Sequence, residues 1–340
     1  GELKPTNKIT DYAFFVSFFP MLVAGPIVRA SHFLPQLTRP VVISRVMLGT
    51  GITLILSGLF KKLVLADYLA LNFVERVFDN PTLYSGFENL MAMYAYALQI
   101  YGDFSGYSDM AIGLALLMGI TLPLNFNRPY QSASITDFWR RWHISLSSWL
   151  RDYLYVSLGG NRGVSVATVI LCLLFSALGG YVAWWQYQQG EVGWIVGLCA
   201  IFVAVVVLPL LVFRGAMHGW RGIATQANQM LTMLLGGLWH GASPTFLLWG
   251  AWHGLGLALH KAWLQVFPVR EPSQMRFLTT VRPMLRHTLG VVITFHFVCL
   301  GWVLFRAADL TTVQQMGIQV WQHFNPQVID QWLVGYEWVA

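Results

Sequence analysis

A histidine in a long uncharged stretch is the first candidate for chemistry. His240 lies within Gly236–Ala242, and no Asp, Glu, Lys or Arg occurs from Gly222 to His260. If this stretch lies in lipid, its polar side chains must face protein or a water-filled cavity. Histidine is the side chain that most readily exchanges a proton near neutral pH. We therefore consider His240 as a general acid or base; the alternative is a neutral imidazole packed in a core.

A second histidine lies in a segment with helical periodicity. At about 100° per residue, the side chains between Asp137 and Tyr155 separate into an apolar and a polar face. The apolar face holds Phe138, Trp139, Trp142, Leu146, Trp149, Leu150 and Tyr153, and the polar face holds Arg140, Arg141, Ser147, Ser148, Arg151 and Asp152. The mixture of Trp and Arg predicts an amphipathic helix at the membrane interface. His143 falls at the border of the two faces, and helix geometry alone favours a structural role for it.

Two carboxylates stand among glycines and hydroxyls upstream. The polar residues of this segment are Asp103, Ser105, Ser108 and Asp109. All four are good helix N-cap residues. Capping, or pairing with an arginine, explains them at least as well as catalysis does, so they receive no catalytic role. His253 and His260 are spaced as i and i+7, but the pattern offers no third ligand, and no metal site is predicted.

Composition and charge-free runs predict the elements that must position these residues. Of all residues, 56% are hydrophobic and 11% are charged, against about 25% charged in soluble domains. The runs long enough to cross a membrane are Gly163–Gly190, Val192–Phe213 and His287–Phe305. Shorter full or partial spans are predicted at Val46–Phe60 and Met110–Asn127, and two more in Gly222–His260 with a turn near Ser243-Pro244. We predict an all-α, polytopic membrane protein with about eight to ten embedded helices.

The apolar segment Phe14–Arg29 is interrupted by Pro20, Gly25 and Pro26. Interior prolines break or kink a helix, so a broken or re-entrant segment is expected, with a kinked span as the alternative. The first residues include neither a Met nor a signal peptide, and we expect the chain to begin inside a longer protein, without N-terminal spans.

Charge placement predicts the orientation. Arginines exceed acidic residues between Arg128 and Arg162, whereas Glu191 alone separates two long apolar runs. Basic loops favour the cytoplasmic side, which places Glu191 on the other side. The formal net charge of +6 is that of basic loops beside membrane lipid and requires no nucleic acid partner. The cysteines all lie in apolar runs and are predicted packing residues; they are Cys172, Cys199 and Cys299.

Several long motifs, in order along the chain, resemble the membrane-bound O-acyltransferase (MBOAT) family, and within it the bacterial branch that includes alginate O-acetyltransferases. The segments that carry the resemblance are Phe18–Pro20, Ala24–Ile27, Asp103–Met110, Asn125–Tyr130, Asp137–Ser147, Arg151–Tyr155, Leu158–Arg162, Met233–Ala242, Phe295–His296, Gly301–Trp302 and Phe305–Ala307. The resemblance covers nearly the whole chain apart from one block.

The resemblance implies one MBOAT-type membrane domain over residues 1–340, with a helical core around a central funnel, in the bacterial inner membrane. It also implies that His240 is the principal catalytic residue and His143 a second functional histidine. The expected reaction is acetyl transfer from a cytoplasmic thioester to hydroxyls of an exported polysaccharide such as alginate. Acetyl-CoA is expected as co-substrate, with no permanently bound cofactor. The expected partners are membrane lipid, a periplasmic acetyltransferase and polysaccharide export machinery.

One departure from the family pattern lies between the two histidines. The separation of His143 and His240 exceeds that of this branch, and the excess falls at residues 164–220, which we predict to be an inserted transmembrane hairpin. Two crossings would leave both histidines on their usual sides. Two other functions stay open: D-alanyl transfer to teichoic acid with an acyl carrier protein, and a non-catalytic transport or scaffold role in a secretion complex.

Overall fold

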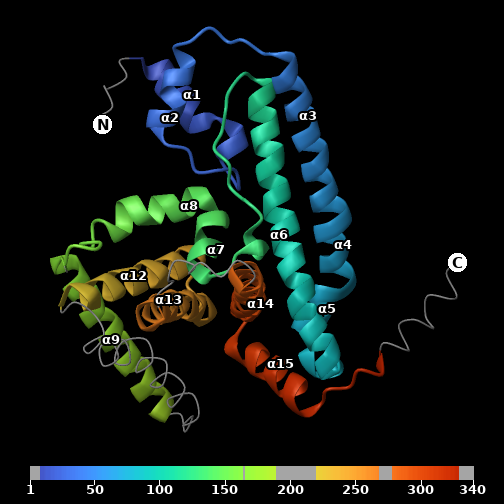
Figure 1. The fold of residues 1–340 in the computed structure, drawn as a ribbon, viewed down its shortest axis with the longest axis vertical. Helices are drawn as coiled ribbons and strands as arrows, with labels where there is room; N and C mark the ends of the chain where they lie inside the picture. Colours follow the sequence, from blue (N-terminus) through green and yellow to red (C-terminus); the bar gives the residue numbers. More distant parts are fainter. Residues whose placement is uncertain (1–7, 164, 189–219, 268–277, 329–340) are drawn as a thin grey trace, which may run out of the picture. The chain divides into compact units, whose positions relative to one another are not determined.

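The computed structural model describes residues 8–163, 165–188, 220–267 and 278–328, and these ranges contain helices and connecting segments without strands (Figure 1). The α-helices are α1 (Ile9–Ser17), α2 (Ala30–Leu37), α3 (Arg45–Leu59), α4 (Asp67–Leu69), α5 (Glu75–Asp79), α6 (Gly86–Leu117), α7 (Ile135–Arg141), α8 (Ile144–Trp149), α9 (Val166–Gln188), α12 (Trp220–His240), α13 (Pro244–Val266), α14 (Leu278–Arg306) and α15 (Leu310–Gln322). Short 3₁₀ segments are η1 (Phe19–Met21), η4 (Pro81–Leu83) and η5 (Pro129–Gln131), and π-helical segments are η2 (Phe60–Ala66), η3 (Ala70–Val74) and η6 (Leu150–Tyr155). The all-α prediction is confirmed for the described residues.

The chain divides into two compact units. The first unit comprises Gly1–Pro129, Arg140–Ser147 and Arg306–Ala340, and the second comprises Tyr130–Trp139 and Ser148–Phe305.

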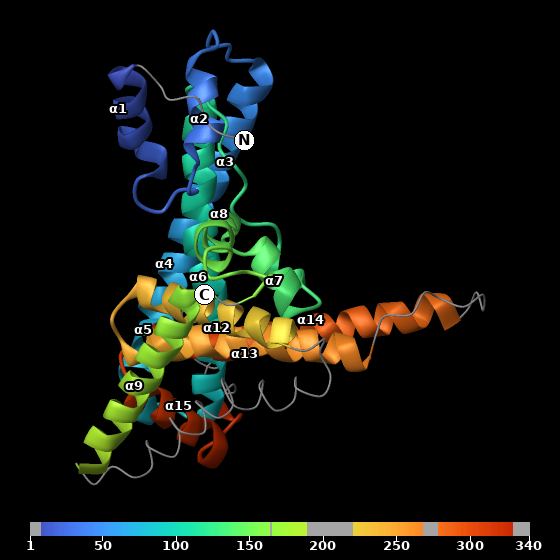
Figure 2. The ribbon, with the colours of Figure 1, turned by 90° about the vertical axis from the view of Figure 1, so that its left-hand side faces the viewer.

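A tight pair of antiparallel helices forms the centre of the first unit. α3 continues through η2 and α4 into α5, and this run lies alongside α6 in both views (Figures 1 and 2). Glycines permit the close approach: a Cβ at Gly58 would lie 2.4 Å from the carbonyl oxygen of Gly106, and a Cβ at Gly51 would lie 2.9 Å from that of Gly113. Small residues at a helix interface let two backbones meet in this way.

The ends of α6 are set by local signals and by α15. Ser85 and Glu88 form a capping box at its N-terminus, where the backbone N–H of Gly86 also donates to the carbonyl of His323 at 2.9 Å. Gly119, with φ +77°, follows its C-terminal end. The predicted segment Met110–Asn127 is helical only as far as Leu117, so a full span over it is wrong and a partial one stays open.

The N-terminal segment is broken, as its prolines predicted. α1 ends at Ser17, Pro20 lies in the short η1, and α2 begins only at Ala30. Phe18 and Phe33 are buried here and pack with their rings 5.0 Å apart. The alternative of one kinked span is wrong.

A helical hairpin forms the centre of the second unit. α12 and α13 lie side by side in both views (Figures 1 and 2), and the turn between them falls at Ser243-Pro244, as expected. The side-chain oxygen of Ser243 accepts a hydrogen bond from the N–H of Thr245, and Pro244 occupies the first helical turn, where its missing N–H costs nothing. The glycines again allow contact, because a Cβ at Gly237 would lie 2.3 Å from the carbonyl oxygen of Phe246.

One buried amide ties α12 to the segments before it. Asn228 donates through Nδ2 to the carbonyls of Gly160 and Gly163, at 3.0 and 2.8 Å, and accepts from Thr168 of α9 at 2.9 Å. The contact therefore fixes the start of α9 on α12.

The predicted spans have different outcomes. Among the described residues, one helical segment, Met284–Arg306, is long and apolar enough to cross a membrane, and it contains the predicted run His287–Phe305. Gly163–Gly190 is helical over Val166–Gln188, whereas Val192–Phe213 lies outside the described residues. The same holds for the second half of the predicted hairpin at 164–220, and the number of spans stays a prediction. Large apolar side chains are exposed on α3 and α14, as on lipid-facing helices; they include Ile52, Leu56, Leu289 and Ile293.

The single amphipathic helix predicted over Asp137–Tyr155 is wrong. The segment forms α7, then a break at Trp142–His143, then α8 and η6. His143 has φ +42°, in the left-handed region that ends a helix. The N–H groups that follow it bond to Asn125 instead of to carbonyls of α7: Ile144 donates to its carbonyl at 2.9 Å and Ser145 to its Oδ1 at 3.3 Å.

Candidate active site

His240 is the last residue of α12 and belongs to the second unit. Its ring lies among four aromatic rings, with centroid distances of 4.9 Å to Trp239, 5.3 Å to Trp249, 4.9 Å to Phe305 and 6.1 Å to Phe246. The imidazole is thus held by flat apolar surfaces at the end of a helix. His240 is half-buried, so a histidine so placed can take or give a proton while it keeps partial access to the surface.

Gly241 explains part of this arrangement. A Cβ at this position would lie 2.7 Å from an atom of the Phe246 ring. The absence of a side chain therefore lets the first turn of α13 close against the end of α12, where His240 stands.

A cluster of ring nitrogens lies next to His240 in the same unit. Trp139, Trp249 and His253 each contact the other two, with centroid distances of 5.8, 5.1 and 4.9 Å. Their nitrogens are buried and have no hydrogen-bond partner within the described part of the chain. Each buried polar group in this state costs about 1–3 kcal/mol. From the sequence, His253 is a weaker catalytic candidate close to His240; in the structure, Trp249 contacts both histidine rings.

The other sequence candidates of this unit have simple surroundings. His260 bonds through Nδ1 to the hydroxyl of Thr136 at 2.9 Å. Cys299 is buried and carries a free thiol, in line with its predicted packing role, whereas Cys172 is exposed and Cys199 lies outside the described residues.

His143 belongs to the first unit, where it is only 5% exposed. Its Nδ1 lies 3.1 Å from Oδ1 of Asn125, and its ring packs edge-on against Phe104 of α6 at 4.6 Å. Asn125 is fully buried and donates through Nδ2 to the hydroxyl of Ser108, at 3.1 Å. The hydroxyl of Ser145 donates to Oδ1 of Asn125 at 2.8 Å. His143 therefore lies buried in a polar network, and its position relative to the membrane stays a prediction.

Asn125 and Ser145 lie within motifs that carry the family resemblance, but the sequence alone suggests no role for either residue. The available signal was an asparagine in a short non-helical stretch, because such a side chain readily bonds to nearby backbone groups.

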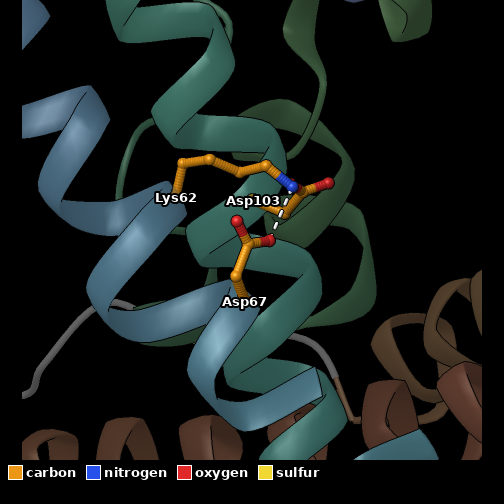
Figure 3. A network of polar contacts seen from close by, with 3 residues as sticks. All are labelled: Lys62, Asp67 and Asp103. Carbon is orange, nitrogen blue, oxygen red and sulfur yellow. Dashed lines mark hydrogen bonds and ion pairs between the residues drawn. The ribbon is translucent and has the colours of Figure 1, made fainter. Parts of the chain in front are cut away.

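The two carboxylates of α6 pair with lysines of the opposite helix. Lys62 contacts Asp103 and Asp67, each at 2.7 Å (Figure 3). Lys61 pairs with Asp109. Figure 3 shows the Lys62 amine between carboxylates from two different helices. Within the described ranges, neither aspartate caps a helix or pairs with an arginine. Opposite charges compensate one another within an apolar helix pair, which is a structural use of the motif.

The structure thus gives each predicted histidine its own surroundings. It groups His240 with the aromatic cluster of the second unit and His143 with Asn125, Ser108 and Ser145 of the first. Among the described residues, no three His, Cys, Asp or Glu side chains gather into a group that could hold a metal ion.

Comparison with known proteins adds independent findings. Residues 4–179 match the family model described as MBOAT, membrane-bound O-acyltransferase family. The chain is 37% identical over 319 residues to "Probable alginate O-acetylase AlgI" of Pseudomonas aeruginosa, covering 93% of the chain and 46% of that protein. It is 37% identical over 306 residues to "Peptidoglycan O-acetyltransferase" of Helicobacter pylori, covering 89% and 45%. It is 27% identical over 311 residues to "Teichoic acid D-alanyltransferase" of Bacillus subtilis, covering 90% and 63%. The chain spans about half the length of the first two relatives.

Proposed function

The chain belongs to the membrane-bound O-acyltransferase family, and from this we propose that it transfers an acetyl group to hydroxyls of a polysaccharide. The observation that carries the proposal is the 37% identity, over about nine tenths of the chain, to relatives named for O-acetylation of alginate and of peptidoglycan. Both named acceptors are polymers of sugars with free hydroxyls. Alginate or a similar exported polysaccharide is the proposed acceptor, and acetyl-CoA on the cytoplasmic side is the proposed donor.

The chemistry follows from what a histidine can do beside a thioester. The acceptor oxygen attacks the carbonyl carbon of the acetyl group, the C–S bond breaks, and the hydroxyl proton ends on the released thiolate. His240 removes that proton and delivers it to sulfur as general base and then general acid. Its aromatic neighbours support this role, because they hold the imidazole in place and cover part of it from water that would hydrolyse the thioester. His143 is proposed as the second functional histidine, which orients or polarises the acyl carbonyl.

We propose that this reaction takes place in the bacterial inner membrane. The protein is a multi-pass protein of the bacterial inner membrane, with a helical core around a funnel through which donor and acceptor reach His240 from opposite faces. Its exposed apolar side chains on α3 and α14 support contact with lipid. A periplasmic acetyltransferase and polysaccharide export machinery complete the pathway, with residues 164–220 as an inserted hairpin.

A second function has one specific observation in its favour. The 27% identity to "Teichoic acid D-alanyltransferase" also covers 90% of the chain. D-alanyl transfer from an acyl carrier protein would use the same ester chemistry. Acetyl transfer is preferred because the identity to the O-acetylating relatives is higher.

The test is labelling of polysaccharide by radioactive acetyl-CoA in membranes that contain the full-length protein. The variants are His240→Ala and His287→Ala, the second a control because the His287 side chain is exposed on α14. At equal abundance, His240→Ala should lose at least about 100-fold in rate, the usual range for a lost general base, whereas the control should keep its rate. Equal labelling by both variants would remove His240 from the chemistry. No labelling by wild type, with transfer from a D-alanyl carrier protein instead, would favour the second function; transfer of neither group would favour a scaffold role.

A further inference from the structure

The side chain of Asn125 forms several hydrogen bonds around His143. Its Oδ1 receives the N–H of Ser145 at 3.3 Å and the hydroxyl of Ser145 at 2.8 Å, and it lies 3.1 Å from Nδ1 of His143. Its Nδ2 donates to Ser108 at 3.1 Å. The side chain is fully buried, so each of these contacts is made without competition from bulk water.

The neighbours of Asn125 determine which way its amide points. The backbone N–H of Ser145 can only donate, and therefore the atom that faces it must be the amide oxygen. The hydroxyl of Ser145 fits the same assignment, because it accepts from the N–H of Ile27 at 3.0 Å and uses its own hydrogen toward Asn125. A reversed amide would set its NH₂ group against the N–H of Ser145.

This orientation fixes the proton on His143. An amide oxygen accepts and cannot donate, so the 3.1 Å contact is a hydrogen bond only when Nδ1 of His143 carries the hydrogen. The Ser145 hydroxyl, 3.5 Å from the same Nδ1, already directs its hydrogen to Asn125. In the neutral ring the other nitrogen, Nε2, then holds the lone pair. The hydrogen bond at one imidazole nitrogen selects the chemistry open to the other.

Asn125 also holds the backbone of His143 in an unfavourable conformation. A φ of +42° is uncommon for a residue other than glycine and persists where the surroundings enforce it. The carbonyl and Oδ1 of Asn125 accept the first free N–H groups of α8, from Ile144 and Ser145. Asn125 therefore caps α8 from a distant part of the chain and stabilises the turn that buries His143.

We propose that Asn125 is a positioning residue of the acyl-transfer site, which keeps His143 protonated on Nδ1 and so makes Nε2 the nitrogen that exchanges a proton or contacts the acyl group. This inference rests on the proposed function for the use made of Nε2. The state of the ring itself does not depend on that function and can be measured without substrate.

The first measurement is ¹⁵N NMR of the full-length protein in lipid nanodiscs, with labelled histidine and with His143→Gln to assign the signal. Wild type should show His143 with hydrogen on Nδ1. Asn125→Leu, which removes the acceptor, should lose this state, and Asn125→Asp, which keeps an acceptor oxygen of similar shape, should restore it. Asn127→Asp is the matched control, because the same change falls two residues away on an exposed side chain. A wild-type ring protonated only on Nε2 would overturn the proposal, whatever the enzyme's activity.

The second measurement is acetyl transfer by the same variants at equal abundance. Asn125→Leu should lower kcat about 10- to 100-fold, the range found when hydrogen-bond partners of metal-binding histidines are removed, with a smaller change in KM. Asn125→Asp should recover part of the loss, and Asn127→Asp should match wild type. If Asn125→Leu does not accumulate, Asn125→Asp and the wild-type NMR signal still decide the matter. Full activity in a folded Asn125→Leu protein would refute the positioning role.

Discussion

Replacement of Gly58 by alanine tests whether the close contact of α3 and α6 stabilises the fold. A Cβ at Gly58 would lie 2.4 Å from the carbonyl oxygen of Gly106 and 2.6 Å from Cγ of Met110. The methionine side chain can move, but the carbonyl belongs to the backbone of α6, so the two helices must separate. Gly49 lies on the same helix, where an added Cβ would meet nothing within 4 Å, and Gly49→Ala is the matched control.

The expected magnitude combines two effects. Alanine is favoured over glycine inside a helix by about 1 kcal/mol, and this gain applies to both variants. Overpacking of a tight contact costs about 1–3 kcal/mol and applies only to Gly58→Ala. Gly49→Ala should therefore be more stable than wild type by up to about 1 kcal/mol, and Gly58→Ala should lie about 1–3 kcal/mol below that control.

Thermal unfolding in one detergent, followed by tryptophan fluorescence, compares the two variants directly. Activity supplies a second readout, because α6 carries Phe104 and Ser108 against His143 and Asn125. A shift of α6 should lower acetyl transfer in Gly58→Ala but not in Gly49→Ala. Equal melting temperatures and equal activities of the two variants would refute the close contact between α3 and α6 at Gly58.

Three further predictions concern other contacts. Hydrogen bonds from Thr312 hold the pKa of Asp309 below its usual range. The charged cap of α15 therefore stabilises the folded protein fully at pH values above the pKa of Asp309 in the unfolded chain. This stabilisation is lost as the pH falls through the pKa of Asp309 in the folded protein. Asp309→Ala should speed amide exchange in the first turn of α15 about fivefold, for a loss of about 1 kcal/mol; unchanged exchange would contradict the cap. Lys62→Met should lower the free energy of unfolding by at most about 1 kcal/mol, and by less when Asp103 is already replaced by Asn. An equal loss with and without Asp103→Asn would show that Lys62 and Asp103 are not energetically coupled. His253→Leu should melt no lower than wild type, because its ring nitrogens have no partner in the described chain; a clear loss of stability would reveal one.

Much of the helical layout follows from local sequence signals. Ser243-Pro244 ends one apolar run and starts another, because serine caps a helix and proline fits its first turn. Pro20 divides the N-terminal apolar segment for the same reason that proline breaks any helix. Such signals act between neighbours in the chain, and they can therefore be recognised from the sequence alone.

The sequence-based predictions are wrong where residues from another segment determine the local structure. The periodicity of apolar side chains predicts one helix over Asp137–Tyr155. This pattern contains no information about other acceptors that compete for the backbone N–H groups. Asn125 supplies those acceptors from another segment, and the helix breaks at His143. In the same way, the partners of Asp103 and Asp109 depend on the register of α3 against α6, which is set by glycines on both helices.

The motifs that carry the family resemblance have a common physical purpose in the first unit. Ile27, Ser108, Asn125 and Ser145 come from four different motifs, yet one chain of hydrogen bonds joins them: the N–H of Ile27 donates to Ser145, Ser145 donates to Asn125, and Asn125 donates to Ser108. His143 is attached to the middle of this chain. A change in the side chain of Ser108, Asn125 or Ser145 leaves a buried donor or acceptor unpaired, at a cost of about 1–3 kcal/mol. Ile27 takes part through its backbone N–H, which other side chains leave in place. Motifs far apart in sequence thus meet in one chain of hydrogen bonds, which holds the His143 imidazole in one orientation.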